Sequence, residues 1–340
     1  RIFKKHGVSP DSDEGKQLFE RYAQAFVEHR LEPPIPSWLY PKVNSDGSIS
    51  TETTHDALKA YMERMHRVSF LIRRPPFKDP FGADREKALR YLREMYAYLK
   101  ANNWHRHAYL YVVDEPNTKD AYELVRKWGK LIHDAHPDLK LLCTEQPTPQ
   151  KPEWGTLIGA VDIWCPLWAL IDEDALKERL EAGDELWSYT ALCQGAKPTP
   201  WWQLDFPLLN YRIPLWQSWM SGMTGILYWS TVFWTRVKDP WTQPQTYGSE
   251  RTPFNCEGLL FYPGVDAGIA GPVTSMRLKA LRDGMEDYEY FVLLSQVVGK
   301  EAVSQLVKSI APSWFKWETD PKRLLKAREQ VAEMLIQNIR

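Results

Sequence analysis

Stretches of helical periodicity alternate with short apolar runs along most of the chain. Between residues 15 and 28, Leu18, Tyr22 and Phe26 fall on one helical face, after acidic residues that favour a helix N-terminus. This spacing predicts a helix. Similar patterns predict further helices in 54–66, 83–102 and 118–135, and helical sequence returns in 274–297 and 299–340.

The apolar runs between the helical stretches predict strands. Their apolar residues are nearly continuous rather than alternating, which is typical of parallel strands covered on both faces. Six runs show this pattern: 68–72, 108–113, 139–143, 161–165, 186–192 and 225–234. A seventh strand is expected near 31–40, although prolines interrupt that segment.

The longest uncharged stretch, between Arg212 and Arg236, has the length of a membrane span. It contains Gln217, Ser218 and Gly222 among other polar and glycine residues. We therefore interpret it as the end of a buried helix, a glycine turn and a buried strand, and predict no membrane span.

Repeated strand, loop and helix units predict an α/β fold, either a doubly wound sheet or a (β/α)8 barrel. Seven strands and a start at Arg1 without an initiator methionine favour a barrel whose first strand lies upstream. We expect the barrel to occupy 1–298 and C-terminal helices to pack on it from 299–340. The compartment is not assigned, because a signal peptide would also lie upstream of Arg1.

Composition excludes several function classes. The chain has 340 residues, with 43 Lys and Arg against 44 Asp and Glu, so no global positive field favours nucleic acid. Four cysteines without a CxxC pair indicate neither a disulfide framework nor a zinc site, and His133 with His136 lacks a third ligand. The chain has no GxGxxG, P-loop or GxSxG motif, and we predict no metal and no cofactor. The oligomeric state stays open.

Two adjacent acids end one predicted strand. In residues 111–116, YVVDEP, Pro116 stops the strand and leaves Asp114 and Glu115 at its carboxyl end, where a barrel keeps its catalytic groups. Two close carboxyls drive their pKa values apart, as glycoside hydrolysis requires. Because successive strand residues point to opposite faces, both can serve one site only if the backbone leaves extended geometry. The alternative is that Asp114 caps the next helix and Glu115 is solvated.

Tryptophan is unusually frequent, with 16 residues, and eleven of them lie between Trp154 and Trp241. Flat aromatic rings beside carboxylates suit the C–H faces and hydroxyl edges of a sugar, although each ring can equally fill a core. Several of these tryptophans lie at strand ends or in the following loops: Trp164, Trp168, Trp201, Trp202, Trp229 and Trp234. Their placement favours a saccharide ligand.

Several segments in order resemble one enzyme family. They are YVVDEP, LYWSTVFW at 227–234 with DPW at 239–241, YPG at 262–264, SMRLK at 275–279 and RDGMEDYEYFVLL at 282–294, supported by EHR at 28–30 and by 205–219 with Arg212 and Trp216. Together they resemble the catalytic domain of glycoside hydrolase family 123, also catalogued as domain of unknown function 4091. Segment 282–290 taken alone suggests only a structural helix with an Arg282–Glu286 pair.

The resemblance implies a (β/α)8 barrel, with a β-sandwich domain expected upstream and absent from this chain. It also implies an exo-acting, retaining β-N-acetylgalactosaminidase. Glu115 would be general acid and then base, and Asp114 would hold the N–H of the substrate's 2-acetamido group, whose carbonyl oxygen is the nucleophile. With the loop pattern, it leads us to expect an aromatic sugar pocket lined by Trp164, Tyr189, Trp229, Trp234 and Tyr262. The partner is then a glycan or glycoconjugate with a terminal amino sugar.

Two loops depart from the family pattern. Many relatives have Gly-Asp-Gly before the YPG segment, where this chain has Asn255-Cys256-Glu257-Gly258, and Cys193-Gln194-Gly195 is also atypical. These departures concern sugar and leaving-group specificity more than the two acids. Two other hypotheses stay open: a glycosidase for another sugar, with Glu145 or Asp162 as the second carboxylate, and a barrel that binds saccharide without turnover.

Overall fold

The computed structural model of the chain describes residues 1–192 and 197–338. These residues form two compact units, each assembled from separate segments. The first comprises Arg1–Leu31, Leu167–Glu173 and Ser188–Arg340, and the second comprises Glu32–Pro166 and Asp174–Trp187. One strand, β7 (Glu185–Thr190), begins in the second unit and ends in the first.

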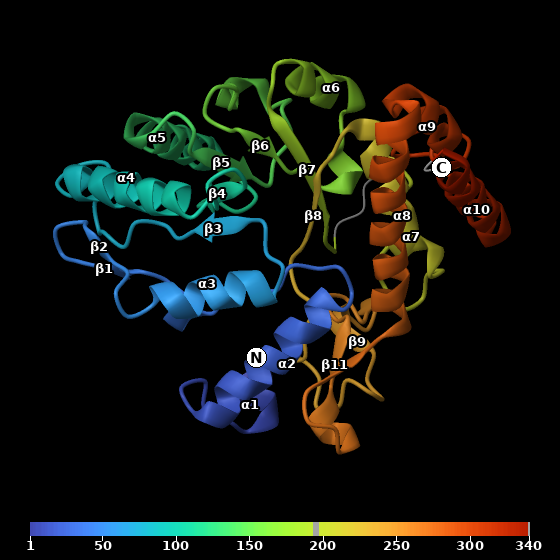
Figure 1. Cartoon of the computed structure of the whole chain (residues 1–340), viewed down its shortest axis with the longest axis horizontal. Coiled ribbons are helices and arrows are strands. Elements are labelled where there is room, and N and C mark those ends of the chain that lie inside the picture. The colour runs from blue at the N-terminus through green and yellow to red at the C-terminus, as the bar shows by residue number, and fades with distance from the viewer. Residues whose placement is uncertain (193–196, 339–340) are drawn as a thin grey trace. The chain divides into compact units, whose positions relative to one another are not determined.

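A parallel sheet with helices forms the second unit (Figure 1). Ile72 pairs with Leu110, Tyr111 with Leu142 and Cys143 with Trp164, so the carboxyl ends of these strands meet at one edge. The strands are, in order, β3 (Phe70–Ile72), β4 (Ala108–Tyr111), β5 (Lys140–Cys143), β6 (Ile163–Trp164) and the start of β7. The helices are α3 (His55–Arg64), α4 (Arg85–Ala101), α5 (Lys119–Ala135) and α6 (Glu173–Glu181), whose first residue belongs to the first unit. Smaller elements are β1 (Lys42–Val43), β2 (Ile49–Ser50) and the 3-10 turns η1 (Ser37–Leu39) and η2 (Pro152–Trp154).

Helix α5 shows how the sequence pattern builds this unit. The side chain of Thr118 accepts a hydrogen bond from the Ala121 N–H and so caps the helix. Its apolar face, which includes Trp128 and Ile132, is buried. A Cβ added at Gly129 would lie 2.5 Å from the Ala160 carbonyl oxygen, so glycine permits the close approach of α5 to the segment before β6.

The first unit combines helices with short hairpins. It contains α1 (Ile2–His6), α2 (Asp13–Val27), η3 (Trp168–Leu170), α7 (Leu209–Ser221), β8 (Gly225–Tyr228), β9 (Gln245–Ser249), β10 (Thr252–Asn255), β11 (Phe261–Pro263), η4 (Gly264–Ala267), β12 (Pro272–Thr274), α8 (Met276–Val298), α9 (Lys300–Lys308) and α10 (Pro321–Asn338). Strand β8 follows β7 in the strand order, β9 pairs with β10, and β11 pairs with β12.

Helices α7 to α10 lie side by side around one apolar core (Figure 1). Trp216, Trp219 and Phe291 are among its buried side chains. The Asp287 carboxylate lies fully buried in this region and accepts two hydrogen bonds from the Arg212 guanidinium, at 2.6 and 2.8 Å. Segment 282–294 of the family pattern therefore has a structural role in joining α8 to α7.

The predicted elements are largely confirmed, and one strand is corrected. The helices predicted in 15–28, 54–66, 83–102, 118–135 and 274–297 correspond to α2, α3, α4, α5 and α8, and the helical sequence of 299–340 forms α9 and α10, with 309–320 between them. The strand expected near 31–40 is wrong: its prolines remove ladder donors, and the segment holds only η1.

The buried helix, glycine turn and strand expected in the uncharged stretch are confirmed, but β8 is half-buried rather than buried. Helix α7 ends at Ser221, Gly222 follows in the left-handed conformation with a φ of 67°, and β8 comes next. None of the helices in the described part of the chain is long and apolar enough to cross a membrane. The α/β class is confirmed with six sheet strands, whereas a closed (β/α)8 barrel and the boundary at 298/299 stay predictions.

Candidate active site

The two adjacent acids follow β4 in the second unit, and both side chains are exposed. The backbone at Glu115 has a φ of 42°, in the left-handed region that residues other than glycine seldom adopt. Such conformations cluster at functional sites, where the surrounding structure holds them in place. The backbone therefore leaves extended geometry at Glu115, which is the condition that the sequence hypothesis set for both acids to serve one site.

Residues on β4 and after β5 hold the acids. The Tyr111 hydroxyl donates a hydrogen bond to Asp114 Oδ1, and the Thr144 hydroxyl lies 3.3 Å from the same oxygen. The Glu115 N–H donates to Thr144 Oγ1 at 2.8 Å. Burial, reinforced by the hydrogen bond to Asp114, raises the pKa of Tyr111. Tyr111 therefore stays protonated and acts as a donor at neutral pH.

A third carboxyl group, Glu145, lies directly after Thr144. Its side chain is 3 % exposed and accepts hydrogen bonds from the Gln146 N–H at 2.8 Å and from Gln150 Nε2 at 2.5 Å. Gln150 Nε2 also donates to the Pro116 carbonyl at 3.3 Å and so links this loop to the one that carries the acids. Burial raises the pKa of Glu145, and the nearby Glu115 raises it further.

Asp162 lies at the other edge of the sheet, because it precedes β6 whereas Glu115 follows β4. Its carboxylate contacts His133 Nε2 at 2.9 Å and accepts the Leu141 N–H at 2.7 Å. The hypothesis that Asp162 is the catalytic partner of Glu115 is therefore wrong. Glu145, by contrast, follows β5 and lies at the same edge as the acids.

Trp164 is fully buried in β6 of the second unit. Its indole N–H donates to Asp184 at 2.7 Å, and Asp184 precedes β7 at the amino edge of the sheet. These are the contacts of a core side chain, and a place for Trp164 in a sugar pocket stays a prediction.

In the first unit, Trp229 follows β8 and is half-buried. Its indole N–H donates to Glu257 Oε1 at 2.8 Å, and the Tyr228 hydroxyl lies 3.1 Å from the same oxygen. Glu257 is 1 % exposed. Burial raises the pKa of its carboxyl group, although the hydrogen bonds from Trp229 and Tyr228 act to lower it. A Cβ added at Gly258 would lie 2.6 Å from the Trp229 ring, so the indole is held between Glu257 and Gly258.

The atypical loop before β11 has a specific geometry. Cys256 has a φ of 55°, in the left-handed region that residues other than glycine seldom adopt. The Arg277 guanidinium donates to the Cys256 carbonyl at 3.1 Å and to the Tyr262 hydroxyl at 3.3 Å. Burial raises the pKa of Tyr262 to about 12. The hydroxyl of Tyr262 is thus engaged by buried protein groups.

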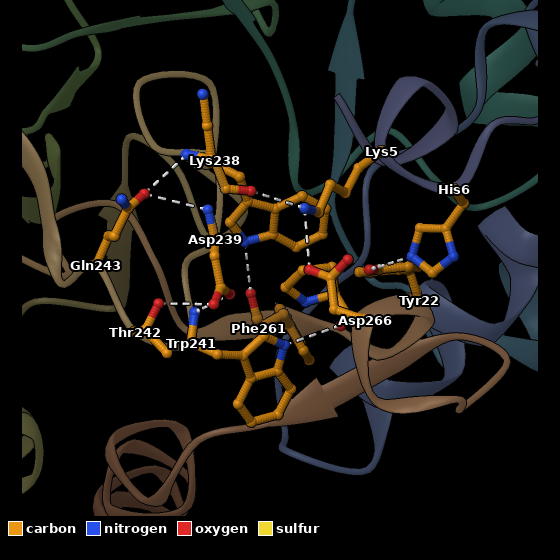
Figure 2. Close-up of polar contacts among 12 residues, drawn as sticks. Lys5, His6, Tyr22, Lys238, Asp239, Trp241, Thr242, Gln243, Phe261 and Asp266 are labelled. Carbon is orange, nitrogen blue, oxygen red and sulfur yellow. Dashed lines mark hydrogen bonds and ion pairs between the residues drawn. The ribbon is translucent and has the colours of Figure 1, made fainter.

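Helix α1 supports the loop that contains Trp234. Figure 2 shows Lys5 Nζ donating to the Lys238 carbonyl at 3.1 Å and pairing with Asp266 at 2.9 Å. Trp234 is buried, and its indole N–H donates to the Phe261 carbonyl at 2.9 Å. Trp234 thus contributes to the packing of this loop.

The predicted site residues divide between the units. Asp114, Glu115 and Trp164 belong to the second, whereas the first contains Tyr189, which is buried near the end of β7, together with Trp229, Trp234 and Tyr262. Their membership of one pocket stays a prediction. The Cys193-Gln194-Gly195 loop lies outside the described residues.

Sequence reasoning missed Thr144 and Glu257 as supports of the candidate residues. Thr144 carried one signal, since it comes directly after the strand that follows the acids along the chain, and Glu257 lay in the loop already noted as atypical. Within residues 1–192 and 197–338, no group of three or more His, Cys, Asp or Glu side chains is placed to hold a metal ion.

Comparison with known proteins identifies the family. Residues 8–294 match the family described as glycoside hydrolase 123, catalytic domain. Curated proteins give no significant match. One similar solved structure, described as a candidate glycerophosphodiester phosphodiesterase from Galdieria sulphuraria, is 11% identical with a TM-score of 0.30, covering 58% of this chain and 67% of its own. That similarity is too low to support a conclusion. Because the family match spans most of the sequence, the chain belongs to the catalytic domains of glycoside hydrolase family 123.

Proposed function

We propose that this glycoside hydrolase releases terminal β-linked N-acetylgalactosamine with retention of configuration, using the substrate's own acetamide as nucleophile. The observation that carries the proposal is the pairing of Asp114 and Glu115 at the carboxyl end of β4, with Glu115 in a left-handed conformation. Family membership supports the class of reaction. The sugar and the mechanism rest on the resemblance described above.

The proposed mechanism assigns one role to each acid. Asp114 accepts a hydrogen bond from the acetamide N–H and turns the carbonyl oxygen toward the anomeric carbon. Glu115 protonates the leaving oxygen as the anomeric C–O bond breaks and the carbonyl oxygen bonds to carbon, giving an oxazoline-type intermediate. Glu115 then removes a proton from a water molecule as the water oxygen bonds to the anomeric carbon and the bond from that carbon to the carbonyl oxygen breaks. A bound acetamide is an effective nucleophile because its position is fixed.

The contacts of Glu145 argue against direct two-carboxylate chemistry. A carboxylate nucleophile must reach the anomeric carbon, and in retaining enzymes it lies about 5 Å from the acid. Glu145 is at the correct edge of the sheet, but it is buried and both of its oxygens accept hydrogen bonds. Asp114, in contrast, is exposed beside Glu115. This difference favours the acetamide route.

Among the aromatic residues predicted to contact the sugar, we propose Trp229 of the first unit as a stacking residue. Trp229 has the most support, because it is half-buried and its indole is oriented by Glu257. An oriented indole can stack on the C–H face of a sugar ring.

A panel of aryl β-glycosides tests the proposal. The wild type should hydrolyse the N-acetylgalactosaminide and scarcely react with the parent galactoside, which has no acetamide. Glu115→Gln removes the transferable proton and should lower kcat by about 10²- to 10⁴-fold. Glu123→Gln is the matched control, because Glu123 is an exposed residue paired with Arg126 on α5. Full activity of Glu115→Gln would contradict the mechanism, and sugar binding by the wild type without turnover would support a binding protein instead.

A further inference from the structure

Thr144 lies beside both proposed catalytic acids. It follows β5, the neighbour of β4, and Tyr111 pairs with Leu142 in the register of the two strands. Its side chain is 5 % exposed. The hydroxyl offers one proton and two lone pairs, so it can accept one hydrogen bond and donate another.

The lone pairs of Thr144 support the backbone of Glu115. Thr144 Oγ1 accepts the Glu115 N–H at 2.8 Å, and this is the residue with a φ of 42°. A glutamate keeps a left-handed conformation only where the surrounding structure holds it. The bond from Thr144 therefore helps to fix the turn that sets the direction of the Glu115 side chain.

The proton of Thr144 serves Asp114. Thr144 accepts from Glu115, and its own O–H is directed to Asp114 Oδ1 at 3.3 Å. Tyr111 donates to the same oxygen, Oδ1. In the described part of the chain, neither hydroxyl contacts Oδ2, and Asp114 is exposed. These two hydroxyls thus engage Oδ1, and Asp114 is exposed for contact with a ligand.

We infer that Thr144 is a positioning residue that fixes the turn at Glu115 and reserves Asp114 Oδ2 for the acetamide N–H of the substrate. This inference rests on the proposed function and extends it to a residue outside the acidic pair. It assigns different tasks to the two oxygens of Asp114. Oδ1 anchors the carboxylate through Thr144 and Tyr111, and Oδ2 orients the nucleophile.

The test compares Thr144→Val, which has the same shape but no hydroxyl, with Thr144→Ser, which keeps the hydroxyl. Because small displacements of positioned groups can cost up to about 10²-fold in rate, Thr144→Val should lower kcat on the aryl N-acetylgalactosaminide by about 10- to 100-fold with little change in KM. Thr144→Ser should recover most of that loss. A thiazoline analogue of N-acetylgalactosamine, which mimics the bicyclic intermediate, should bind Thr144→Val more weakly by a similar factor.

Thr54→Val controls for the removal of a buried threonine hydroxyl. Thr54 is in the same unit, is buried, and has its hydroxyl 3.5 Å from the Thr51 carbonyl, away from the acids. It should keep wild-type kcat and thiazoline affinity. If Thr144→Val fails to fold by circular dichroism, Tyr111→Phe removes the other anchor of Oδ1 and should weaken thiazoline binding likewise.

The outcomes separate this inference from the proposed function. A folded Thr144→Val with wild-type kcat and thiazoline affinity overturns the role of Thr144 and leaves the proposed function standing. Equal losses in Thr144→Val and Thr144→Ser also overturn it, because the serine hydroxyl should suffice. A wild type that hydrolyses no acetamido glycoside refutes the proposed function, and this inference with it.

Discussion

Replacing Asp287 by Asn is expected to break a buried ion pair in the first unit. Asp287 on α8 is fully buried and accepts hydrogen bonds from Arg212 Nε at 2.6 Å and Arg212 Nη2 at 2.8 Å. The Trp216 indole N–H donates to the same carboxylate at 2.8 Å. Although burial lowers the pKa of Arg212, the bonds to Asp287 outweigh that effect and raise it. The carboxylate thus compensates a guanidinium that is itself mostly buried.

The cost of the change follows from what remains after it. Removing one partner of a buried ion pair typically destabilises a protein by about 3–5 kcal/mol, because the other charge is left uncompensated. Asparagine has nearly the same shape, and its carbonyl can still accept from Trp216. We therefore expect a loss near the lower limit, about 3 kcal/mol.

Urea unfolding followed by circular dichroism measures this loss. The midpoint should fall while the slope of free energy against urea stays the same, since the surface exposed on unfolding does not change. Asp283→Asn is the matched control on the same helix: Asp283 pairs with Arg282, both partly exposed, at 2.8 Å, and such pairs contribute at most about 1 kcal/mol. Equal midpoints for the two variants would refute the reasoning.

Two further predictions concern the sheet edge and the Trp229 site. The hydrogen bond to Asp162 raises the pKa of His133, so its charged form stabilises the fold below about pH 6.5 and this contribution is lost as pH rises through the higher folded pKa. His133→Asn should thus reduce the free energy of unfolding more at pH 5.5 than at pH 8.5. The difference should be no more than about 1 kcal/mol, because the side chains of His133 and Asp162 are both partly exposed. An equal loss of stability at the two pH values would contradict this prediction. Gly258→Ala should lower the melting temperature more than Gly7→Ala, because both glycines have a φ of 69° but only at Gly258 would the new Cβ meet the Trp229 ring, at 2.6 Å. Equal decreases in melting temperature for the two variants, measured by differential scanning fluorimetry, would show that the Trp229 ring moves to accommodate the new Cβ.

Sequence pattern predicted the long elements well because each buries an extended apolar face. Helices such as α4 and α5 repeat apolar residues over several turns, and the buried parallel strands are bounded by turns. The hairpins β9–β10 and β11–β12 were missed because their strands, QTYGS, TPFN, FYP and PVT, contain polar residues or prolines and lack the continuous apolar runs that marked the sheet strands. The segment at 31–40 is apolar enough for a strand, but its prolines lack the backbone N–H groups that strand pairing requires.

The candidate site was predictable only where one segment contained it. Asp114 and Glu115 are adjacent, and Pro116 marks the end of their strand. Their support from Thr144 is a contact between neighbouring strands, and the left-handed conformation of Glu115 follows no preference of glutamate. The contact between Trp229 and Glu257 likewise joins segments far apart in the sequence.

The abundance of tryptophan has a mixed explanation. Trp164, Trp168, Trp202 and Trp216 are fully buried, so much of the tryptophan content builds cores rather than a ligand surface. Trp229 differs because it is half-buried, and its indole is oriented by a carboxylate that is costly to bury. The aromatic pattern therefore indicated a sugar ligand less directly than the acids did.

The most direct test of the proposed mechanism is the rate of hydrolysis of aryl β-N-acylgalactosaminides in which the acetyl group carries zero, one, two or three fluorines. Fluorine withdraws electrons from the carbonyl oxygen and weakens it as a nucleophile without changing the acids of the enzyme. If the acetamide attacks the anomeric carbon, kcat/KM should fall steeply and steadily with each added fluorine. A rate that stays level across the series would show that the carbonyl oxygen is not the nucleophile and would contradict the roles given to Asp114 and Glu115.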